Sequence, residues 1–499
     1  MNTLAEEAQV QDGGQGALSE LDDFSAILKQ TINPTTENAE RAIDNALATV
    51  VQTAMADQSL IDEDVIDTIN AMIAGLDQEL SSQINEILHN EEFQSVESSW
   101  RGLAYTLNNS ETGASLQCEV LNTSKKELAG MMKRYPGAKW DRSPLYRQIY
   151  ERKIGTLGGD PMGAVMGDFY FDHSPADVAL LTSMSKISEA ALAPFLSSAA
   201  PRLLGLDSWN ELSNPPDIEE LFTASDYAGW NSLRESENAR FLGLTLPRVL
   251  AREPYGPEST MTVDEFNFTE DTDGHKGEKY SWMNAAHAMA VNINRAFKEH
   301  GWTVRIRGVQ SGGEVAQLPT HHFDTGAGEK DLKCPTEVSI DDRREGELSK
   351  VGLLGLVHRQ NTDKAVFLGG QSLYKPKSYV DPEATASDNM SSRLPYMFAV
   401  SRFSHYLKAM IRDQIGSSKD KDQIRMDLQT WIDQYVTLNP QNASEKEKAE
   451  KPLADAKVEV VEDELNPGYY MGKFFLKPHF QMEGMDIGMS LVSKIPPPK

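Results

Sequence analysis

The residues best suited to chemistry include a glycine-rich stretch at 155–161, whose composition is that of a loop able to hold a phosphate. It lacks the G-x-G-x-x-G spacing of a dinucleotide-binding loop, and the chain contains no G-x-x-x-x-G-K-[ST] phosphate loop of the Walker type. Clustered glycines are typical of tight turns, because glycine adopts positive φ without steric cost. We therefore interpret 155–161 as a turn ahead of a strand near Gly167.

The other candidates for chemistry are a serine, a cysteine and a pair of histidines. Ser372 follows two glycines and a glutamine, but Tyr374 stands where the nucleophile motif G-x-S-x-G requires glycine. His321 and His322 would point to opposite sides of a strand, and Cys334, twelve residues later, gives no zinc-binding spacing. The sequence therefore shows no catalytic constellation, and we predict that the protein is not an enzyme and needs no metal or cofactor.

An excess of acidic residues limits the kinds of partner. The 499 residues include 75 Asp and Glu against 48 Lys and Arg, a net charge of −27. Residues 1–100 alone hold 20 acidic residues against two basic ones, Lys29 and Arg41. Binding to nucleic acid or to an anionic membrane surface needs clustered basic residues, so this charge argues against both.

Targeting and membrane signals are also lacking in the sequence. The N-terminus has no basic segment followed by an apolar run, and the most apolar stretch, 190–206, is interrupted by Pro194, Pro201 and Arg202. The two cysteines indicate a reducing compartment rather than a disulfide framework. We expect a cytoplasmic protein without direct membrane insertion.

The succession of helical and strand patterns predicts a mixed α/β (α+β) fold in three parts. We expect a helical N-terminal arm at 1–57, a helical hairpin with an α/β domain of mixed sheet at 58–380, and a C-terminal domain at 381–499. The last part would end in a β-hairpin and an exchangeable terminal strand. In the middle part, strands are expected at 115–121, 167–171, 241–244, 303–306, 337–340 and 365–367, and helices at 125–135, 175–196, 281–300 and 341–350.

Two amphipathic helices are expected near the N-terminus. The first, 17–31, ends before Pro34. The second lies in the region 36–89, which is expected to be helical almost throughout, and it carries a single apolar stripe from 61 to 87. The first helix would either dock on its own domain or act as a linear recognition helix, and the second would pack in a helical hairpin or against a partner chain. The apolar positions of the first helix are Leu18, Leu21, Phe24, Ile27 and Leu28, and those of the second are Ile61, Val65, Ile69, Met72, Leu76 and Leu80, continued by Ile84 and Ile87.

The C-terminal part combines helices and strands. We expect helices at 390–415 and 420–436 after a connector at 376–388, and a hairpin of strands 457–462 and 469–476 around Asn466-Pro467-Gly468. A final strand alternates apolar and polar residues between Pro478 and three terminal prolines, and it could join its own sheet or that of another molecule. Its apolar positions are Met485, Ile487, Met489 and Leu491.

From residue 99 onward the chain resembles the large sheath subunit of bacterial type VI secretion systems, the TssC or VipB family. The segments that carry the resemblance occur in the same order along the chain. They include Ser99-Trp100-Arg101-Gly102-Leu103, Gly167-Asp168-Phe169-Tyr170-Phe171, Phe241-Leu242-Gly243-Leu244-Thr245-Leu246-Pro247-Arg248, Ile306-Arg307-Gly308-Val309, Cys334-Pro335-Thr336-Glu337, Ser401-Arg402-Phe403-Ser404-His405-Tyr406-Leu407 and Lys477-Pro478-His479-Phe480-Gln481.

The resemblance implies a mechanical function. Members of this family pair with a small sheath subunit of the TssB (VipA) type, and the heterodimers polymerise, with further copies of themselves, around an inner tube of the Hcp type on a baseplate. Contraction of the sheath propels the tube, and a disassembly ATPase of the ClpV type recycles the subunits. The resemblance also implies that helix 17–31 is the handle for this ATPase and that the terminal strands interlink neighbouring protomers.

Two other functions stay open. A phage-like contractile injection sheath belongs to the same structural class, but it would usually be built from one polypeptide rather than two. An α/β enzyme that uses the glycine-rich loop would instead bind a small ligand saturably and remain a monomer or small oligomer.

Overall fold

The computed structural model describes residues 41, 45, 65–214, 217–257, 259–264, 266–326, 328–415, 418–462, 470–479 and 481. The chain divides into two compact units. The first comprises residues 1–88 and 255–271, and the second comprises residues 89–254 and 272–499.

Apart from Arg41 and Asn45, the described part of the first unit consists of one long helix and a loop. Helix α3 (Val65–Leu88) is 24 residues long and carries no basic residue in its last turn. The loop closes on itself, because the backbone amide of Tyr255 donates to a carboxylate oxygen of Glu270 (2.9 Å) and the Glu270 amide donates back to the Tyr255 carbonyl (2.8 Å). The amide of Asp271 donates to Asn85 Oδ1 (2.9 Å), which attaches the end of the loop to α3.

The second unit is built on a six-stranded mixed sheet with the strand order β1-β2-β3-β9-β10-β6. The first four strands are parallel, and β10 is antiparallel to both of its neighbours. The mixed α/β fold class predicted from the sequence is therefore confirmed. The strands are β1 (Val165–Phe171), β2 (Phe195–Ala199), β3 (Leu242–Leu246), β9 (Leu353–His358), β10 (Ala365–Phe367) and β6 (Glu314–Val315).

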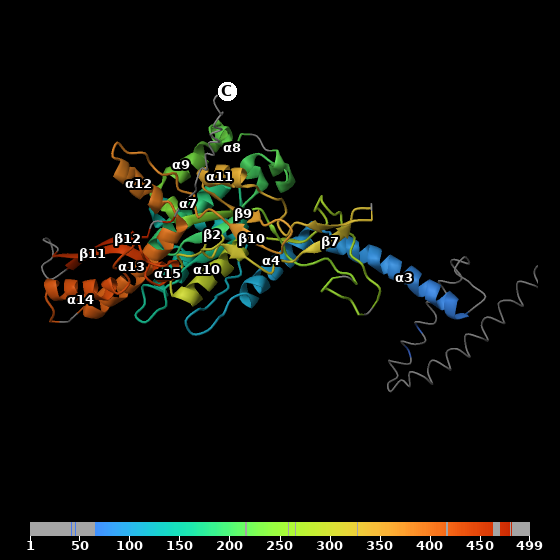
Figure 1. Ribbon diagram of the computed structural model, residues 1–499, viewed down its shortest axis with the longest axis horizontal. Helices are drawn as coiled ribbons and strands as arrows, with labels where there is room; N and C mark the ends of the chain where they lie inside the picture. Colours follow the sequence, from blue (N-terminus) through green and yellow to red (C-terminus); the bar gives the residue numbers. More distant parts are fainter. Residues whose placement is uncertain are drawn as a thin grey trace, which may run out of the picture. The chain divides into compact units, whose positions relative to one another are not determined.

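Two hydrophobic cores lie on opposite faces of this sheet. Phe195 belongs to one core and its neighbour Leu196 to the other, and Leu353 and Leu354 divide in the same way. This alternation follows from the two-residue period of a strand, and burial on both faces is typical of parallel strands. In Figure 1, α7 (Pro175–Ala191) and α10 (Ala286–His300) lie on opposite sides of the central strands.

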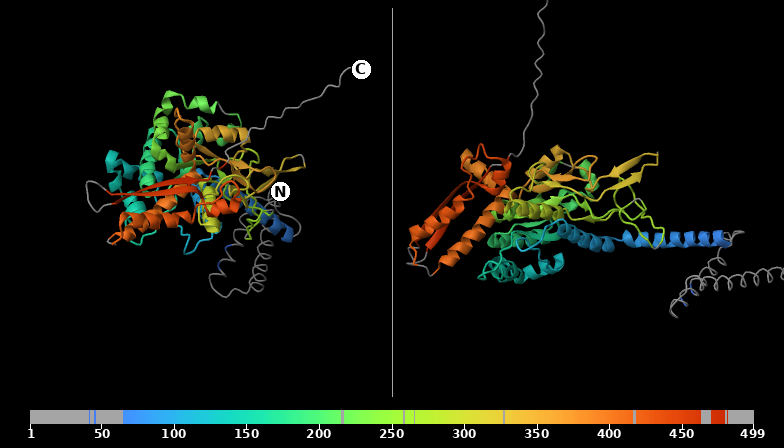
Figure 2. Two further views of the ribbon diagram at one scale, coloured as in Figure 1. Left: turned by 60° about the vertical axis from the view of Figure 1, so that its left-hand side comes forward. Right: turned by 60° about the horizontal axis from the view of Figure 1, so that its bottom comes forward.

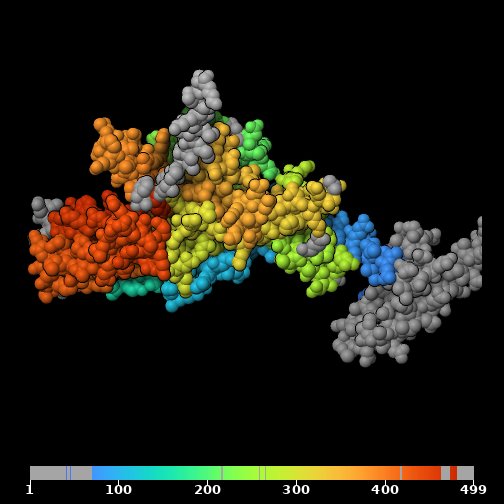
Figure 3. All heavy atoms as spheres, in the orientation of Figure 1, coloured from blue at the N-terminus to red at the C-terminus, as the bar shows by residue number. Residues whose placement is uncertain are grey.

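A third core forms beside the sheet, where a β-hairpin packs on two helices (Figure 2). The hairpin consists of β11 (Leu453–Glu462) and β12 (Tyr470–Pro478), and the helices are α13 (Leu394–Gln414) and α14 (Lys421–Asp433). The hairpin contributes Leu453, Val458 and Phe474 from one face of its ladder to this core. In the space-filling view, the hairpin and α14 form one continuous surface (Figure 3).

Local signals explain where several helices begin. Ser124 and Glu127 form a capping box at the start of α5 (Lys125–Lys133), and Ser174 caps α7, whose first residue is proline. These side chains satisfy backbone amides that have no partner within the helix. The helices predicted at 125–135 and 341–350 are therefore confirmed within about two residues, the second as α11 (Asp342–Lys350), which Asp341 caps.

Three of the predicted strands are wrong. Residues 115–121, 303–306 and 337–340 form no strand. Val304 and Ile306 are buried in apolar cores without joining a ladder, whereas Val120 and Leu121 are exposed. Alternating apolar residues can be buried by side-chain packing alone. The alternation therefore does not show that a neighbouring strand is present to form a hydrogen-bonded ladder.

Other boundaries also needed correction. The helix predicted at 175–196 ends at Ala191, because Leu192 has a left-handed φ of 54° and strand β2 follows. The helix predicted at 281–300 begins only at Ala286, since β5 (Trp282–Met283) pairs with β4 (Val249–Leu250). The connector predicted at 376–388 contains the start of α12 (Pro382–Ser391). The strand expected from 457 begins at Leu453, and a short helix, α15 (Glu445–Glu450), precedes it.

Several predictions lie outside the described residues. These are the helix at 17–31, the Asn466-Pro467-Gly468 turn and the terminal strand at 485–491. The domain boundaries at 57 and 380 also stay predictions.

Candidate functional site

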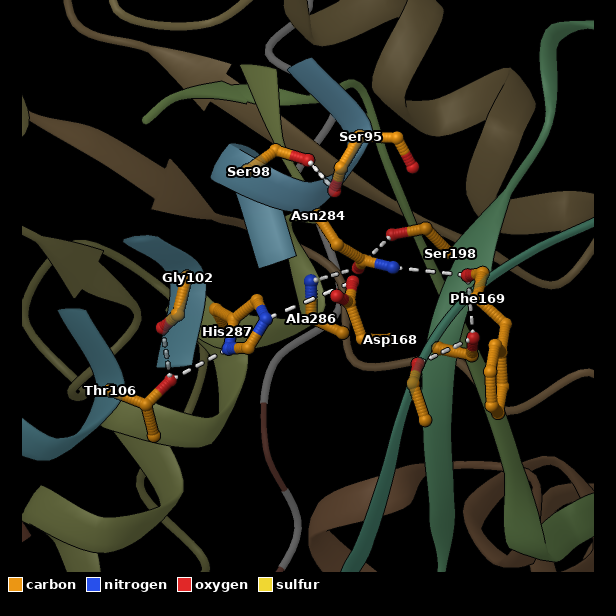
Figure 4. Close-up of polar contacts among 12 residues, drawn as sticks. Ser95, Ser98, Gly102, Thr106, Asp168, Phe169, Ser198, Asn284, Ala286 and His287 are labelled. Carbon is orange, nitrogen blue, oxygen red and sulfur yellow. Dashed lines mark hydrogen bonds and ion pairs between the residues drawn. The ribbon is translucent and has the colours of Figure 1, made fainter. Parts of the chain in front are cut away.

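A buried polar cluster joins three segments that are far apart in the sequence (Figure 4). Thr106 on α4 (Glu91–Asn108) lies with its Oγ1 2.8 Å from Nδ1 of His287 on α10. The Nε2 of the same imidazole lies 3.8 Å from Oδ1 of Asp168 on β1. Burial by itself raises the pKa of Asp168, but His287 and the neighbouring Ser99 and Asn284 outweigh it, so this pKa is lowered.

A hydroxyl, an imidazole and a carboxylate in this order are the components of a nucleophile triad. In such a triad the imidazole accepts the hydrogen bond of the hydroxyl, and here the hydrogen bonds run in another direction. The Thr106 hydroxyl donates to the Gly102 carbonyl (3.0 Å), so the imidazole Nδ1–H donates to Thr106 instead of removing its proton. Thr106 and His287 are both buried. A Cβ at Gly102 would lie 2.4 Å from Cδ2 of His287, so only glycine fits here. The cluster fastens α4 onto α10 and β1.

Asn284 makes a second junction next to this cluster. Its Oδ1 accepts hydrogen bonds from Ser198 Oγ (2.6 Å) and from the backbone amide of Ala286 (2.8 Å), and its Nδ2 donates to the Phe169 carbonyl (3.0 Å). The N-cap residue of α10, Ala285, has no side-chain acceptor for the amides of the first turn. Asn284 accepts one of these hydrogen bonds in its place and also links the helix to β1 and β2.

An ion pair between a buried carboxylate and a partly exposed guanidinium makes a third junction. Arg248 donates from Nε to one oxygen of Glu337 and from a terminal nitrogen to the other, both at 2.7 Å. Burial lowers the pKa of Arg248, but the hydrogen bonds and charge of Glu337 outweigh this effect and raise it. The pKa of Tyr170 is raised mainly by burial, and the charges of Arg248 and Glu337 both act on its hydroxyl group. These three residues come from three of the segments that carry the family resemblance.

The residues first considered for chemistry lie in structural positions. Ser372 is buried and donates to the Ser392 carbonyl (2.7 Å). A Cβ at Gly159 would lie 2.2 Å from the Lys153 carbonyl, as expected of a tight turn. His321 contacts the Tyr280 hydroxyl (2.9 Å). Among the described residues, no group of three or more His, Cys, Asp or Glu side chains is arranged to hold a metal ion.

The hairpin is one part of the second unit with strand edges open to further pairing. In the described chain, β11 and β12 form a two-stranded sheet of their own, and the only other bridge to it joins Val436 and Leu453. One face of the hairpin is buried in the third core, while Phe475 and Val461 on the other are 55% and 45% exposed. Strand edges of this kind offer backbone donors and acceptors to an added strand.

The chain leaves the hairpin through a clasp at Gln481. Its Oε1 accepts from Arg307 Nε (2.8 Å), its backbone amide donates to the Tyr396 hydroxyl (2.9 Å), and its Nε2 donates to the Val304 carbonyl (3.2 Å). These bonds fix Gln481, which precedes Met485, Ile487, Met489 and Leu491 in the sequence; those four residues lie outside the described part of the chain.

The predicted apolar stripe of the second helix lies on α3. Met72 is buried, Leu76 is half-buried and Leu80 is 45% exposed. Val65 and Ile69 lie on the same helix, and Ile61 lies outside the described residues, as do Leu18, Leu21, Phe24, Ile27 and Leu28. The partner-facing function of the stripe stays a prediction.

None of the helices in the described part of the chain is long and apolar enough to cross a membrane.

Comparison with known proteins gives consistent matches along almost the whole chain. Residues 70–374 match the family described as EvpB/VC_A0108, tail sheath N-terminal domain, and residues 383–495 match the EvpB/VC_A0108 tail sheath gpW/gp25-like domain. The chain is 52% identical over 486 residues to the type VI secretion system sheath protein TssC1 of Pseudomonas aeruginosa, with 97% of each chain covered.

Two solved structures of the anti-feeding prophage are similar at a lower level. Its baseplate structure has a chain that is 11% identical, with a TM-score of 0.39 and coverage of 78% of this chain and 86% of that chain. Its contracted helical sheath has one that is 12% identical, with a TM-score of 0.32 and coverage of 62% and 66%.

Proposed function

The chain belongs to the EvpB/VC_A0108 tail sheath family, and from this premise we propose how it works as a structural subunit of the contractile type VI secretion sheath. It pairs in the bacterial cytoplasm with a small subunit of the TssB type and polymerises with further copies around an Hcp-type tube on a baseplate. Contraction of this polymer propels the tube, a ClpV-type ATPase then disassembles it, and the subunit itself is not an enzyme.

The observation that supports this assembly best is the open hairpin sheet together with the clasp at Gln481. The hairpin has strand edges for pairing, and the clasp anchors the chain four residues before an alternating apolar segment that can supply a strand to a neighbour. Donation from one subunit to the next is a heterologous contact, and such contacts build open helical polymers.

The polar junctions suit the same function. They hold α4, α10 and the central sheet in one arrangement, so the second unit can move as a rigid body while the strands at its end keep neighbours linked. Contraction then needs subunits to rotate about their links and does not need the core to repack.

Co-expression with the small sheath subunit tests the proposal. We expect the two chains to co-purify and negative-stain images to show long hollow tubes, whereas this chain alone aggregates because open strand edges and apolar surface lack a partner. A stable monodisperse monomer that binds a small ligand saturably would contradict the proposal. Tubes formed without any smaller chain would favour a phage-like sheath.

The recognition helix yields a separate prediction. The changes Leu21→Glu, Phe24→Glu and Leu28→Glu should abolish binding of the ClpV-type ATPase, since each buried anchor contributes about 1.5–3 kcal/mol. Assembly and one round of contraction should be unaffected, and contracted sheaths should persist in cells, as fluorescence microscopy of labelled sheaths can show.

The polar face of the same helix provides the control. Glu20→Gln with Asp22→Asn removes two charges without touching the apolar anchors and should leave ATPase binding unchanged. Equal binding by the anchor variant and the wild type would place the handle elsewhere.

A further inference from the structure

Three aromatic side chains beside the third core lie next to one another and reach the surface. The ring of Tyr406 on α13 lies 5.7 Å from that of Trp431 on α14, and the Trp431 ring lies 5.2 Å from that of Tyr435. Tyr406 is 37% exposed, and the other two are half-buried. We call these three residues the aromatic row.

Packing around the aromatic row holds its rings in place. Trp302 stacks on Phe403 at 4.1 Å and meets the Tyr435 ring edge-on at 5.1 Å. The Arg402 guanidinium lies 4.7 Å from the centre of the Tyr406 ring and donates to the Tyr406 hydroxyl (3.1 Å). The row is therefore preorganised, and a partner would lose little binding free energy in ordering these side chains.

An acidic residue follows the aromatic row along α13. Asp413 is seven residues after Tyr406, so both lie on the same side of the helix, about 10 Å apart along its axis. Asp413 is exposed and belongs to no ion pair among the described residues, whereas Asp427 on α14 is paired with Lys419 (2.7 Å). The surface therefore offers aromatic rings followed by a carboxylate that is open to a basic group.

The chain itself contains a segment with the complementary chemistry. Ile495 is followed by Pro496-Pro497-Pro498-Lys499, which lies outside the described residues. Consecutive prolines favour the polyproline II conformation because their rings fix φ, and aromatic side chains bind such segments at little cost in entropy. A lysine directly after the prolines complements a carboxylate placed beyond the rings.

We propose that residues 495–499 of a second copy of this chain bind to the aromatic row, with the prolines on Tyr406 and Trp431 and Lys499 near Asp413. The choice of a second copy rests on the proposed function, in which the preceding strand at 485–491 is donated to a neighbour. The row and the hairpin share the third core, so a strand added to the hairpin would bring its tail close to the row.

The length of the tail allows this contact. Pro496 is 15 residues after Gln481, which is fixed by its bonds to Arg307 and Tyr396. An extended chain spans about 3.3 Å per residue, so the prolines can lie up to roughly 50 Å from that point. This reach is sufficient for the tail to leave its own subunit.

Fluorescence anisotropy of a labelled peptide tests the contact. The peptide carries residues 493–499 and is titrated with the full-length heterodimer of this chain and the small subunit, below the concentration at which tubes form. We expect saturable binding, and binding at least tenfold weaker for a peptide with alanine in place of the three prolines. Tyr406→Leu keeps an apolar side chain but removes the ring, and it should weaken binding at least tenfold. Asp413→Asn should weaken binding several-fold at low salt.

The matched control is Tyr379→Leu, because this tyrosine is 47% exposed and lies outside the aromatic row. It should bind the peptide as the wild type does. Absence of binding by the wild type, equal binding by Tyr406→Leu or equal binding of the alanine peptide would overturn the proposal. Binding that is seen only after the chain is cut behind Gly484 would also overturn it, since the row would then hold the tail of its own chain.

A sedimentation assay with assembled tubes identifies the occupant. In tubes the tails of neighbouring copies should fill the rows, so tubes should take up at least tenfold less peptide per subunit than dispersed heterodimers. Equal uptake would refute a second copy as the occupant. Heterodimers that bind the peptide but form no tubes would contradict the proposed function and would still support the aromatic row as the binding site for the tail.

Discussion

Cutting the chain after Gly484 is expected to abolish tube formation while leaving the pairing with the small subunit intact. The cut removes Met485, Ile487, Met489 and Leu491 but keeps Gln481 and its bonds to Arg307, Tyr396 and Val304. A strand donated to a neighbour contributes a ladder of backbone hydrogen bonds and an apolar face to the contact between protomers. Without it, folded heterodimers have no such link.

Two measurements separate donation from a structural function within the subunit. Negative-stain images should show no tubes at concentrations where the full-length complex forms them, and the melting temperature of the heterodimer should stay unchanged. Replacing Met485 and Met489 by leucine keeps the apolar face and should keep the tubes. Tubes formed by the truncated complex would refute strand donation, and a lowered melting temperature would assign the strand to the subunit's own core.

Replacing Glu337 by glutamine is expected to destabilise the second unit by about 3 kcal/mol. The change leaves Arg248 without its bidentate partner at a site where the Glu337 side chain is only 4% exposed. Removing one member of a buried pair typically costs about 3–5 kcal/mol, and we expect the lower end because the Arg248 side chain is 38% exposed. Thermal unfolding of the heterodimer measures the loss.

A matched variant on the surface provides the control. Glu219 pairs with Lys350 at 2.8 Å, but both side chains are more than half exposed, so Glu219→Gln should leave the melting temperature unchanged. Changing Arg248 and Glu337 together to methionine should recover much of the stability, because no unpaired charge then remains. An unchanged melting temperature for Glu337→Gln would show that the pair does not stabilise the subunit.

The sequence by itself determined those features that depend on neighbours within one or two turns. The helix predicted at 125–135 begins where the structure shows the capping box of Ser124 and Glu127, and the alternation through Val458 and Val460 before a Pro-Gly turn predicts the hairpin. Caps, turns and apolar periodicity act over a few residues, so they can be read directly from the order of side chains. The family resemblance could also be recognised from the sequence, because it rests on short segments that occur in the same order along the chain.

Tertiary structure alone decided which distant residues meet and which surfaces stay exposed. Thr106 and His287 are 181 residues apart, and Arg248 and Glu337 are 89 apart. Phe93, Val96 and Trp100 on α4 have the same helical spacing as a buried apolar stripe, and only the packing of Gly102 against His287 shows which side of the helix faces solvent. Contacts of this kind depend on how helices and strands pack around a common hydrophobic core. The periodicity within one segment carries no information about which other segments it packs against.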